Sequence, residues 1–253
     1  MTRAELRPFL YTRLGDVKTA FALLTRLPVK ASFDRTAQAT WAFPIVGVGV
    51  GVFILAIALL CDWLGLGLGL SAGVAIAGGV ILTGALHEDG LADSADGLWG
   101  GWTPARRLDI MRDSHIGTYG VLALILAIIL RFMAISAVLN TLHLGAIIVA
   151  AVLSRAAIPF VMTLLPHARA DGLSVQTGRP SRQTVVAGAV IALILSWLAG
   201  GFVPTVFAAC LCVLIVIAVM RIAKTKIGGQ TGDILGATQI LCELGVLGMF
   251  ATL

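Results

Sequence analysis

Long uncharged apolar runs are the feature that most constrains how this chain can fold. The run from Trp41 to Cys61 holds no charged residue, and others of similar length follow it. An α-helix needs ~20 such residues to cross ~30 Å of hydrocarbon. Only 12% of the 253 residues are charged, against about 25% in soluble domains. The sequence therefore predicts an all-α protein, a polytopic transmembrane helical bundle in which residues 1–253 form a single integral-membrane domain.

Seven candidate spans result when the apolar runs are divided at charges and turn residues. They cover about residues 41–61, 64–86, 119–139, 142–165, 184–201, 203–220 and 234–253. A shorter apolar stretch near the N-terminus is interrupted by Arg26 and Pro28. It is too short for the core of a cleavable signal peptide. The prediction is about seven spans plus an N-terminal interfacial or re-entrant helix.

The basic residues predict the orientation of these spans, because positively charged flanks stay on the cytoplasmic side of a membrane. With seven spans, 16 of the 18 Lys and Arg lie in the N-terminal segment and in the second, fourth and sixth connections, all on one side. The opposite connections contain none. The N-terminus is therefore predicted to be cytoplasmic. The net charge of +5 reflects this topology. No basic run with interleaved aromatics suggests nucleic acid, so the expected partner is the lipid bilayer.

Acidic residues concentrate in the second connection, residues 87–118, which holds six of the 13 acids. If the second span continues through it as a helix, Asp89, Asp93 and Asp96 share one face. Like charges on one helix face repel, so a cation is expected between them. Mg²⁺ binds one or two carboxylates and takes other ligands from substrate phosphates. The segment is predicted to hold Mg²⁺ or Mn²⁺, with a solvated face balanced by arginines as the alternative.

Such a metal site favours phosphoryl transfer on the cytoplasmic side. A metal ion that bridges a diphosphate neutralises charge on the transferring group and on the leaving group. Arg106, Arg107 and Arg112 follow the acids in the same connection and could grip the phosphates.

A second candidate site is the glycine-rich segment 228–233, directly before the last span. Thr231 and Gly232 lie where a helix N-terminus offers amide groups to a phosphate. Asp233 is either the N-cap of that helix or a further metal ligand, and the pattern leaves both open.

Three charged residues fall within predicted spans, where charges are rare and usually face the bundle interior. Arg155 is a candidate anion contact. Arg131 lies nearer the outer end of its span, where it could extend its side chain to the interface. Glu243 forms a polar pair with Gln239 at i, i+4 spacing.

Several segments resemble one enzyme family. The run LTGALHEDGLADSADGL at 82–98 strongly resembles the signature of the cobalamin-5'-phosphate synthase family, also called adenosylcobinamide-GDP ribazoletransferase. The run IMRDSHIGTYG at 110–120 agrees with it, although Ser114-His115 stands where Ser-Arg is expected. The resemblance also covers 21–28, 43–47, 154–155 and 231–237, in the order of the family.

The resemblance implies that adenosylcobinamide-GDP and α-ribazole, or α-ribazole 5'-phosphate, are joined with release of GMP. It implies a Mg²⁺-dependent catalytic domain, a multi-pass protein of the bacterial cytoplasmic (inner) membrane with a cytoplasmic active site. The hypothesised metal ligands are Glu88, Asp89, Asp93, Asp96 and Asp233. The candidate catalytic residues, one of which takes the proton of the attacking hydroxyl, are Asp89, Asp93 and Asp113. The candidate substrate-binding residues are His87, Arg112, Arg155, Thr231 and Gly232.

Two other functional classes compete with this one. A CDP-alcohol phosphotransferase also presents spaced aspartates, but Ala105-Arg106 comes too late for its usual pattern. A transporter would use the acids as an ion path and would place charges near the bilayer midplane in discontinuous helices. A homo-oligomer is left open.

Overall fold

The computed structural model describes the backbone of residues 3–253 and the side chains from residue 12 onward, and this part of the chain is almost entirely helical. The helices are α1 (Arg3–Leu24), α2 (Thr36–Ala39), η1 (Thr40–Ala42), α3 (Phe43–Trp63), α4 (Gly67–Thr83), α5 (Leu86–Gly100), α6 (Pro104–Ile110), α7 (Thr118–Thr141), α8 (Gly145–Leu164), α9 (Leu173–Thr177), α10 (Arg182–Gly200), α11 (Phe202–Ile227) and α12 (Gly232–Phe250).

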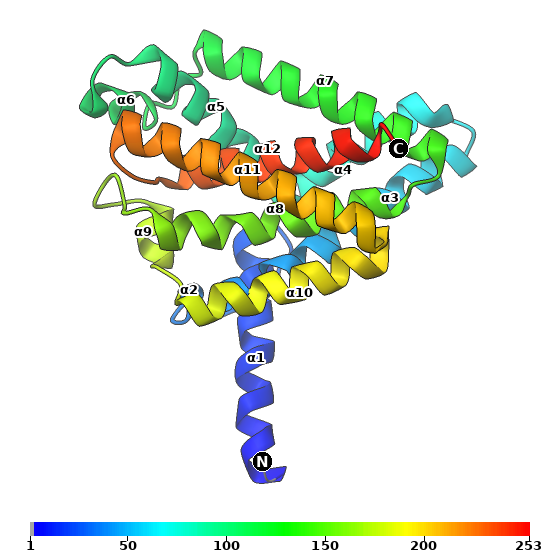
Figure 1. The fold of residues 1–253 in the computed structure, drawn as a ribbon, viewed down its shortest axis with the longest axis horizontal. Helices are drawn as coiled ribbons and strands as arrows, with labels where there is room; N and C mark the ends of the chain where they lie inside the picture. The colour runs from blue at the N-terminus through cyan, green and yellow to red at the C-terminus, as the bar shows by residue number, and fades with distance from the viewer. Residues whose placement is uncertain (1–2) are drawn as a thin grey trace.

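The predicted membrane bundle is confirmed. Six helical segments in the described part are long and apolar enough to cross a membrane, and α4 with α5 makes a seventh if the bent pair counts as one span. Helices α7, α8, α10, α11 and α12 lie roughly side by side, and α1 projects away from them (Figure 1). Helix α1 is not among the candidate spans. Helix α11 is longer than the predicted span because its last turns carry Lys224 and Lys226 beyond the apolar run.

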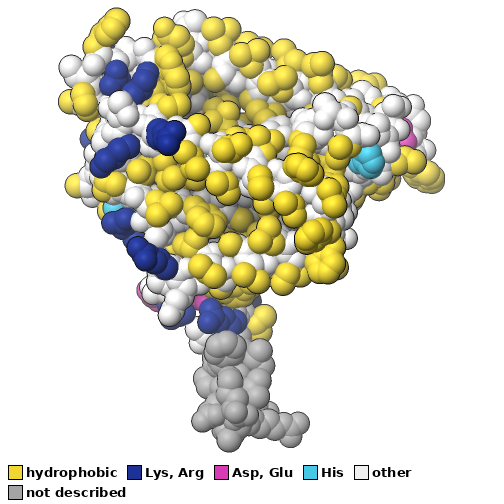
Figure 2. Space-filling model, in the orientation of Figure 1, with side chains coloured by type: hydrophobic (Ala, Val, Ile, Leu, Met, Phe, Trp, Pro, Cys, Tyr) yellow, Lys and Arg dark blue, Asp and Glu magenta, His cyan; other side chains and the backbone are white. Residues whose placement is uncertain are grey.

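One end of the bundle carries most of the basic side chains. Helices α6 and α9, the first turn of α10 and the last turn of α11 meet there, and Figure 2 shows Lys and Arg gathered at this end of the visible face. Between it and the opposite end, that face is mainly hydrophobic. We call the end of the bundle that carries these Lys and Arg side chains the basic end. The side chains of Arg3 and Arg7 lie outside the described part.

The second predicted span, 64–86, differs from the structure. Helix α4 stops at Thr83, and the chain turns by 89° before α5 begins at Leu86. Gly84 and Ala85 both adopt left-handed backbone angles, with φ of 67° and 56°. A left-handed residue at a helix C-terminus ends the helix. The acidic segment is therefore a separate helix and not a continuation of the span.

The sequence predicts that residues 87–118 form a connection between spans. In the structure, helix α5 of this segment is largely buried against the bundle. Leu91 packs in one small apolar cluster with Ala127 of α7 and with Ala237 and Ile240 of α12. The approach to α12 is close at two glycines. A Cβ on Gly90 would lie 2.9 Å from the Asp233 carbonyl oxygen, and one on Gly236 would lie 3.2 Å from the Gly90 Cα. This contact brings the acids of α5 to the first turn of α12.

Changing Gly90 to Ala should destabilise the protein by about 1–3 kcal/mol, because the new methyl group meets backbone atoms that cannot turn aside. Gly248→Ala is the matched control on α12, since nothing lies within 4 Å of its Cβ position. There, alanine should stabilise the helix by up to about 1 kcal/mol. Thermal unfolding in detergent measures both variants, and an unchanged Tm for Gly90→Ala would contradict the close contact.

Candidate active site

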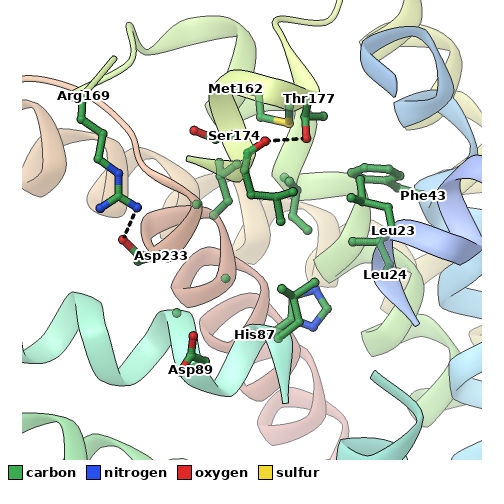
Figure 3. Close-up of a pocket in the computed structure, with 17 residues that line it drawn as sticks. Leu23, Leu24, Phe43, His87, Asp89, Met162, Arg169, Ser174, Thr177 and Asp233 are labelled. Atoms are coloured by element: carbon green, nitrogen blue, oxygen red, sulfur yellow. Dashed lines mark hydrogen bonds and ion pairs between the residues drawn. The ribbon is translucent and has the colours of Figure 1, made fainter. Parts of the chain in front are cut away.

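A cleft of about 210 Å³ lies near the basic end, where α5, α8, α9, the first turn of α12 and the C-terminal end of α1 meet. Figure 3 shows Asp89, Asp233 and Arg169 on one side and Leu23, Leu24 and Phe43 on the other. The cleft is thus polar and charged on one wall and apolar on the opposite wall.

Asp233 reaches the cleft because another residue caps α12. The Thr231 hydroxyl accepts a hydrogen bond from the Ile234 amide (3.3 Å) and donates one to Asp233 Oδ2 (3.0 Å). This excludes the N-cap reading of Asp233, since the N-cap is Thr231. The Asp233 carboxylate lines the cleft, and its role as a metal ligand stays a prediction. Thr231 itself is fully buried, so it holds Asp233 and does not line the cleft. Gly232 does line it.

Arg169 pairs with Asp233, and the sequence did not single it out. The loop after α8 is tied to the loop before α12 by the backbone bonds from Gln230 N to Pro166 O (2.8 Å) and from Ala168 N to Gln230 O (2.9 Å). This contact sets Arg169 Nη2 3.3 Å from Asp233 Oδ2. Arg169 Nη1 is buried and has no hydrogen-bond partner. Arg169 lines the cleft, so a guanidinium with one donor unpaired lies beside Asp233.

No local signal would have found Arg169. It is one of the basic residues that set the predicted topology, and its partner lies 64 residues away.

Four aspartates interact near the α5–α12 contact, three on α5 (Asp89, Asp93 and Asp96) and Asp233 on α12. Asp89 lines the cleft. The negative charges of Asp89, Asp233 and Asp96 act on the Asp93 carboxyl, and the positive charge of Arg169 partly offsets them. Among the described residues, no three His, Cys, Asp or Glu side chains form a group that could hold a metal ion by themselves. Mg²⁺ commonly takes only one or two carboxylates and completes its shell with water and substrate phosphate. The donor set of Asp89 and Asp233, with Asp93 beside them, fits such an ion.

Asp96 is occupied elsewhere. Its two carboxylate oxygens accept the backbone amides of Gly117 (2.7 Å) and Gly120 (2.9 Å) at the start of α7. A carboxylate stabilises a helix N-terminus, where amides lack partners. Any side chain at Gly117 or Gly120 would collide with this carboxylate. The structure thus gives Asp96 a role in joining α5 to α7, in place of the predicted metal contact.

Glu88 belongs to a buried ion-pair network with Arg131, Glu243 and Arg155. Arg131 Nη1 lies 2.9 Å from Glu88 Oε1, and Arg131 Nε lies 3.1 Å from Glu243 Oε1. Arg155 Nη1 lies 3.8 Å from Glu243 Oε2. The network holds two positive and two negative groups in the bundle interior. It joins α5, α7, α8 and α12.

This network changes three expectations. Arg131 is only 6% exposed, so it is paired inside the bundle and does not extend to the interface. Arg155 is 2% exposed and donates to the Ala151 carbonyl, so it does not line the cleft as a substrate contact. Glu88 faces Arg131 and not the cleft, because successive residues of a helix point in different directions. Glu243 does pair with Gln239, as predicted.

Asp113 and Arg112 lie outside the cleft. Arg112 forms an exposed ion pair with Asp171. Asp113 accepts hydrogen bonds from the ring and backbone of His115, and these hydrogen bonds lower the pKa of the Asp113 carboxyl. A carboxylate with a lowered pKa is a weaker base, which does not suit the predicted catalytic role. Arg107 is also occupied, by the carbonyls of Gly101 and Lys226.

His87 lies at the inner end of the cleft. It is 3% exposed, lines the cleft, and its Nε2 has no hydrogen-bond partner. A buried polar atom without a partner is costly, so this nitrogen lacks a partner that a bound ligand or a water molecule could supply. Of the predicted substrate-binding residues, the structure brings His87 and Gly232 to the cleft.

Comparisons with known proteins give this geometry a chemical context. A family model for cobalamin-5-phosphate synthase matches residues 16–251. An adenosylcobinamide-GDP ribazoletransferase of Bradyrhizobium diazoefficiens is 44% identical, with 92% of each chain covered. Enzymes with the same description from Azorhizobium caulinodans and Sinorhizobium medicae are each 41% identical, over 92% and 98% of this chain and 94% and 98% of their own. No solved structure matches this chain.

Proposed function

Because the chain belongs to the cobalamin-5-phosphate synthase family, we propose that it joins adenosylcobinamide-GDP to α-ribazole or its 5'-phosphate at the cleft between α5 and α12. The products are adenosylcobalamin, or its 5'-phosphate, and GMP. This is the attachment of the lower ligand in cobalamin biosynthesis.

The observation that carries this assignment is the meeting of Asp89 and Asp233 in one cleft, with the spare donor of Arg169 beside them. A diphosphate ester needs positive charge along its phosphates and a carboxylate near the attacking hydroxyl. The cleft offers both. The α12 N-terminus adds the amide of Gly232, which can donate to a phosphate oxygen.

In the proposed reaction, a ribose hydroxyl of the acceptor attacks the phosphorus that carries the cobinamide. A new P–O bond forms, the P–O bond within the diphosphate breaks, and GMP leaves with the bridging oxygen. The hydroxyl proton passes to one of the two α5 carboxylates, Asp89 or Asp93. Arg169 holds phosphate oxygens and keeps the Asp233 carboxylate oriented by their ion pair.

The proposed cofactor is Mg²⁺, held by Asp89 and Asp233 with Asp93 in support. When bound, it would neutralise charge on the transferring phosphoryl group and on the leaving group. The apolar wall of Leu23, Leu24 and Phe43 limits the access of water, which would otherwise compete with the acceptor hydroxyl.

We also propose that the basic end faces the cytoplasm and that the membrane is the bacterial inner membrane. The support is the gathering of Lys and Arg at this end, since such residues stay on the cytoplasmic side. This orientation opens the cleft to substrates made in the cytoplasm.

Purified protein in liposomes tests the proposed function. With both substrates and Mg²⁺, GMP release should accompany corrinoid product in a one-to-one ratio. EDTA should reduce the rate to background, and added Mg²⁺ should restore it. Full turnover in excess chelator would contradict the metal requirement, and no GMP release from correctly folded protein would contradict the assigned reaction.

A membrane transporter is the alternative function to compare with the transferase, because transporters also use charged residues in discontinuous helices. The α4–α5 break and the buried ion-pair network have this appearance, although the sequence places most acids in connections. Two arginines and two glutamates balance each other there, however, so the network offers no net charge to an ion. The family match favours the transferase.

A further inference from the structure

A second cavity adjoins the cleft. It measures about 480 Å³ and lies between the C-terminal end of α1, the segment that leads to α2, the α4–α5 break and α9. We call it the second chamber. Leu23, Leu86, Leu173 and Thr177 line both cavities, so the two adjoin at these residues.

The hydroxyl groups that line the second chamber can act only as hydrogen-bond acceptors. Four threonines line it, and each is at least nine-tenths buried. Each hydroxyl donates to a nearby backbone carbonyl: Thr25 to Phe21, Thr36 to Phe33, Thr83 to Gly79 and Thr177 to Leu173. A hydroxyl has one proton and two lone pairs. Because the protons are used, the threonine oxygens can only accept, and that of Thr25 already accepts from the Leu27 amide (3.3 Å). The chamber therefore suits a ligand with several hydroxyl or N–H donors.

Arg26 supplies the positive charge of the second chamber. No Asp or Glu lines the chamber, and among the described residues Arg26 forms no ion pair or side-chain hydrogen bond. Its side chain lies against Gly84, so closely that any Cβ there would collide with the guanidinium group. Arg26 is exposed and lies over the α4–α5 break with its donors unused. The lining also includes the exposed amide of Gln176. A phosphate monoester is the partner that such a guanidinium binds best.

We propose that the second chamber binds the acceptor nucleoside, and that Arg26 contacts its 5'-phosphate. This inference rests on the proposed function. Ribose hydroxyls match the threonine acceptors, and the apolar base matches Phe33 and the shared leucines. The donor's diphosphate belongs with Asp89 and Asp233, since the second chamber has no carboxylate to hold a metal ion. The shared wall then sets the acceptor beside the phosphorus that it attacks.

Steady-state kinetics with both acceptors test this inference. Arg26→Met keeps the length of the side chain and removes its charge. We expect KM for α-ribazole 5'-phosphate to rise about tenfold or more, the loss of one charge-assisted contact. KM for α-ribazole, KM for adenosylcobinamide-GDP and kcat should stay within about twofold. Arg26→Lys should recover part of the loss.

Thr36→Val provides a second, nearly isosteric variant that removes one acceptor oxygen. It should raise KM for both acceptors severalfold and leave KM for the donor unchanged. Equal effects of Arg26→Met on both acceptors would overturn the phosphate contact. A raised KM for adenosylcobinamide-GDP alone would instead place the donor's guanosine in the second chamber and overturn the inference. If the unaltered protein turns over neither acceptor, the proposed function fails, which is a separate result.

Discussion

Replacing Asp89 by Asn is expected to lower kcat by at least about 100-fold, the effect of removing one group aimed at the charge of a transition state. Asparagine keeps the size of the side chain but cannot take a proton and binds a hard cation more weakly. The helix should remain intact, because Asp89 is exposed to the cleft and forms no side-chain hydrogen bond or ion pair with a described residue. GMP release by purified protein in liposomes measures the loss.

Asp109→Asn is the matched control for this variant. Asp109 lies on α6 in the same acidic segment, is exposed, and does not line the cleft. Its replacement should leave kcat within about twofold. Asp93→Asn, made as a separate variant, should also lower kcat. Near-normal turnover in both α5 variants would contradict the assignment of this cleft as the active site.

Replacing Arg131 by Met should destabilise the protein by about 3 kcal/mol or more, because Glu88 and Glu243 would then share the bundle interior with Arg155 alone. Removing one partner of a buried ion pair leaves a charge without compensation. Thermal unfolding in detergent should show a markedly lower Tm. Activity should fall too, since the first turn of α5 is no longer tied to α7.

The double variant Arg131→Met with Glu88→Gln separates charge from packing. It leaves Glu243 with Arg155, so no charge is unpaired, and it should recover a large part of the lost stability. Arg221→Met is the control, an exposed basic residue at the end of α11, and its Tm should not change. If the double variant is no more stable than Arg131→Met, the effect of Arg131 comes from packing and not from its ion pairs.

The sequence by itself determined the class of the protein, the approximate spans and the concentration of acids around Asp89 and Asp93. These follow from local quantities. The transfer of ~20 consecutive apolar residues into lipid does not depend on which helices surround them. The distribution of Lys and Arg along the chain needs no tertiary contact to be read. The signature around Asp89 and Asp93 is likewise contiguous, so it could be compared directly with a known family.

Only the tertiary structure decided which charged residues share the cleft. Glu88 and Asp89 are neighbours in sequence, yet one pairs with Arg131 43 residues away and the other faces the cleft. Asp96 turned out to join α5 to α7, Arg155 to be buried, and Arg169 to meet Asp233. The physical reason is that the direction of each side chain depends on the break at Gly84 and Ala85 and on the approach of α5 to α12. Both are set by contacts between helices far apart in the chain.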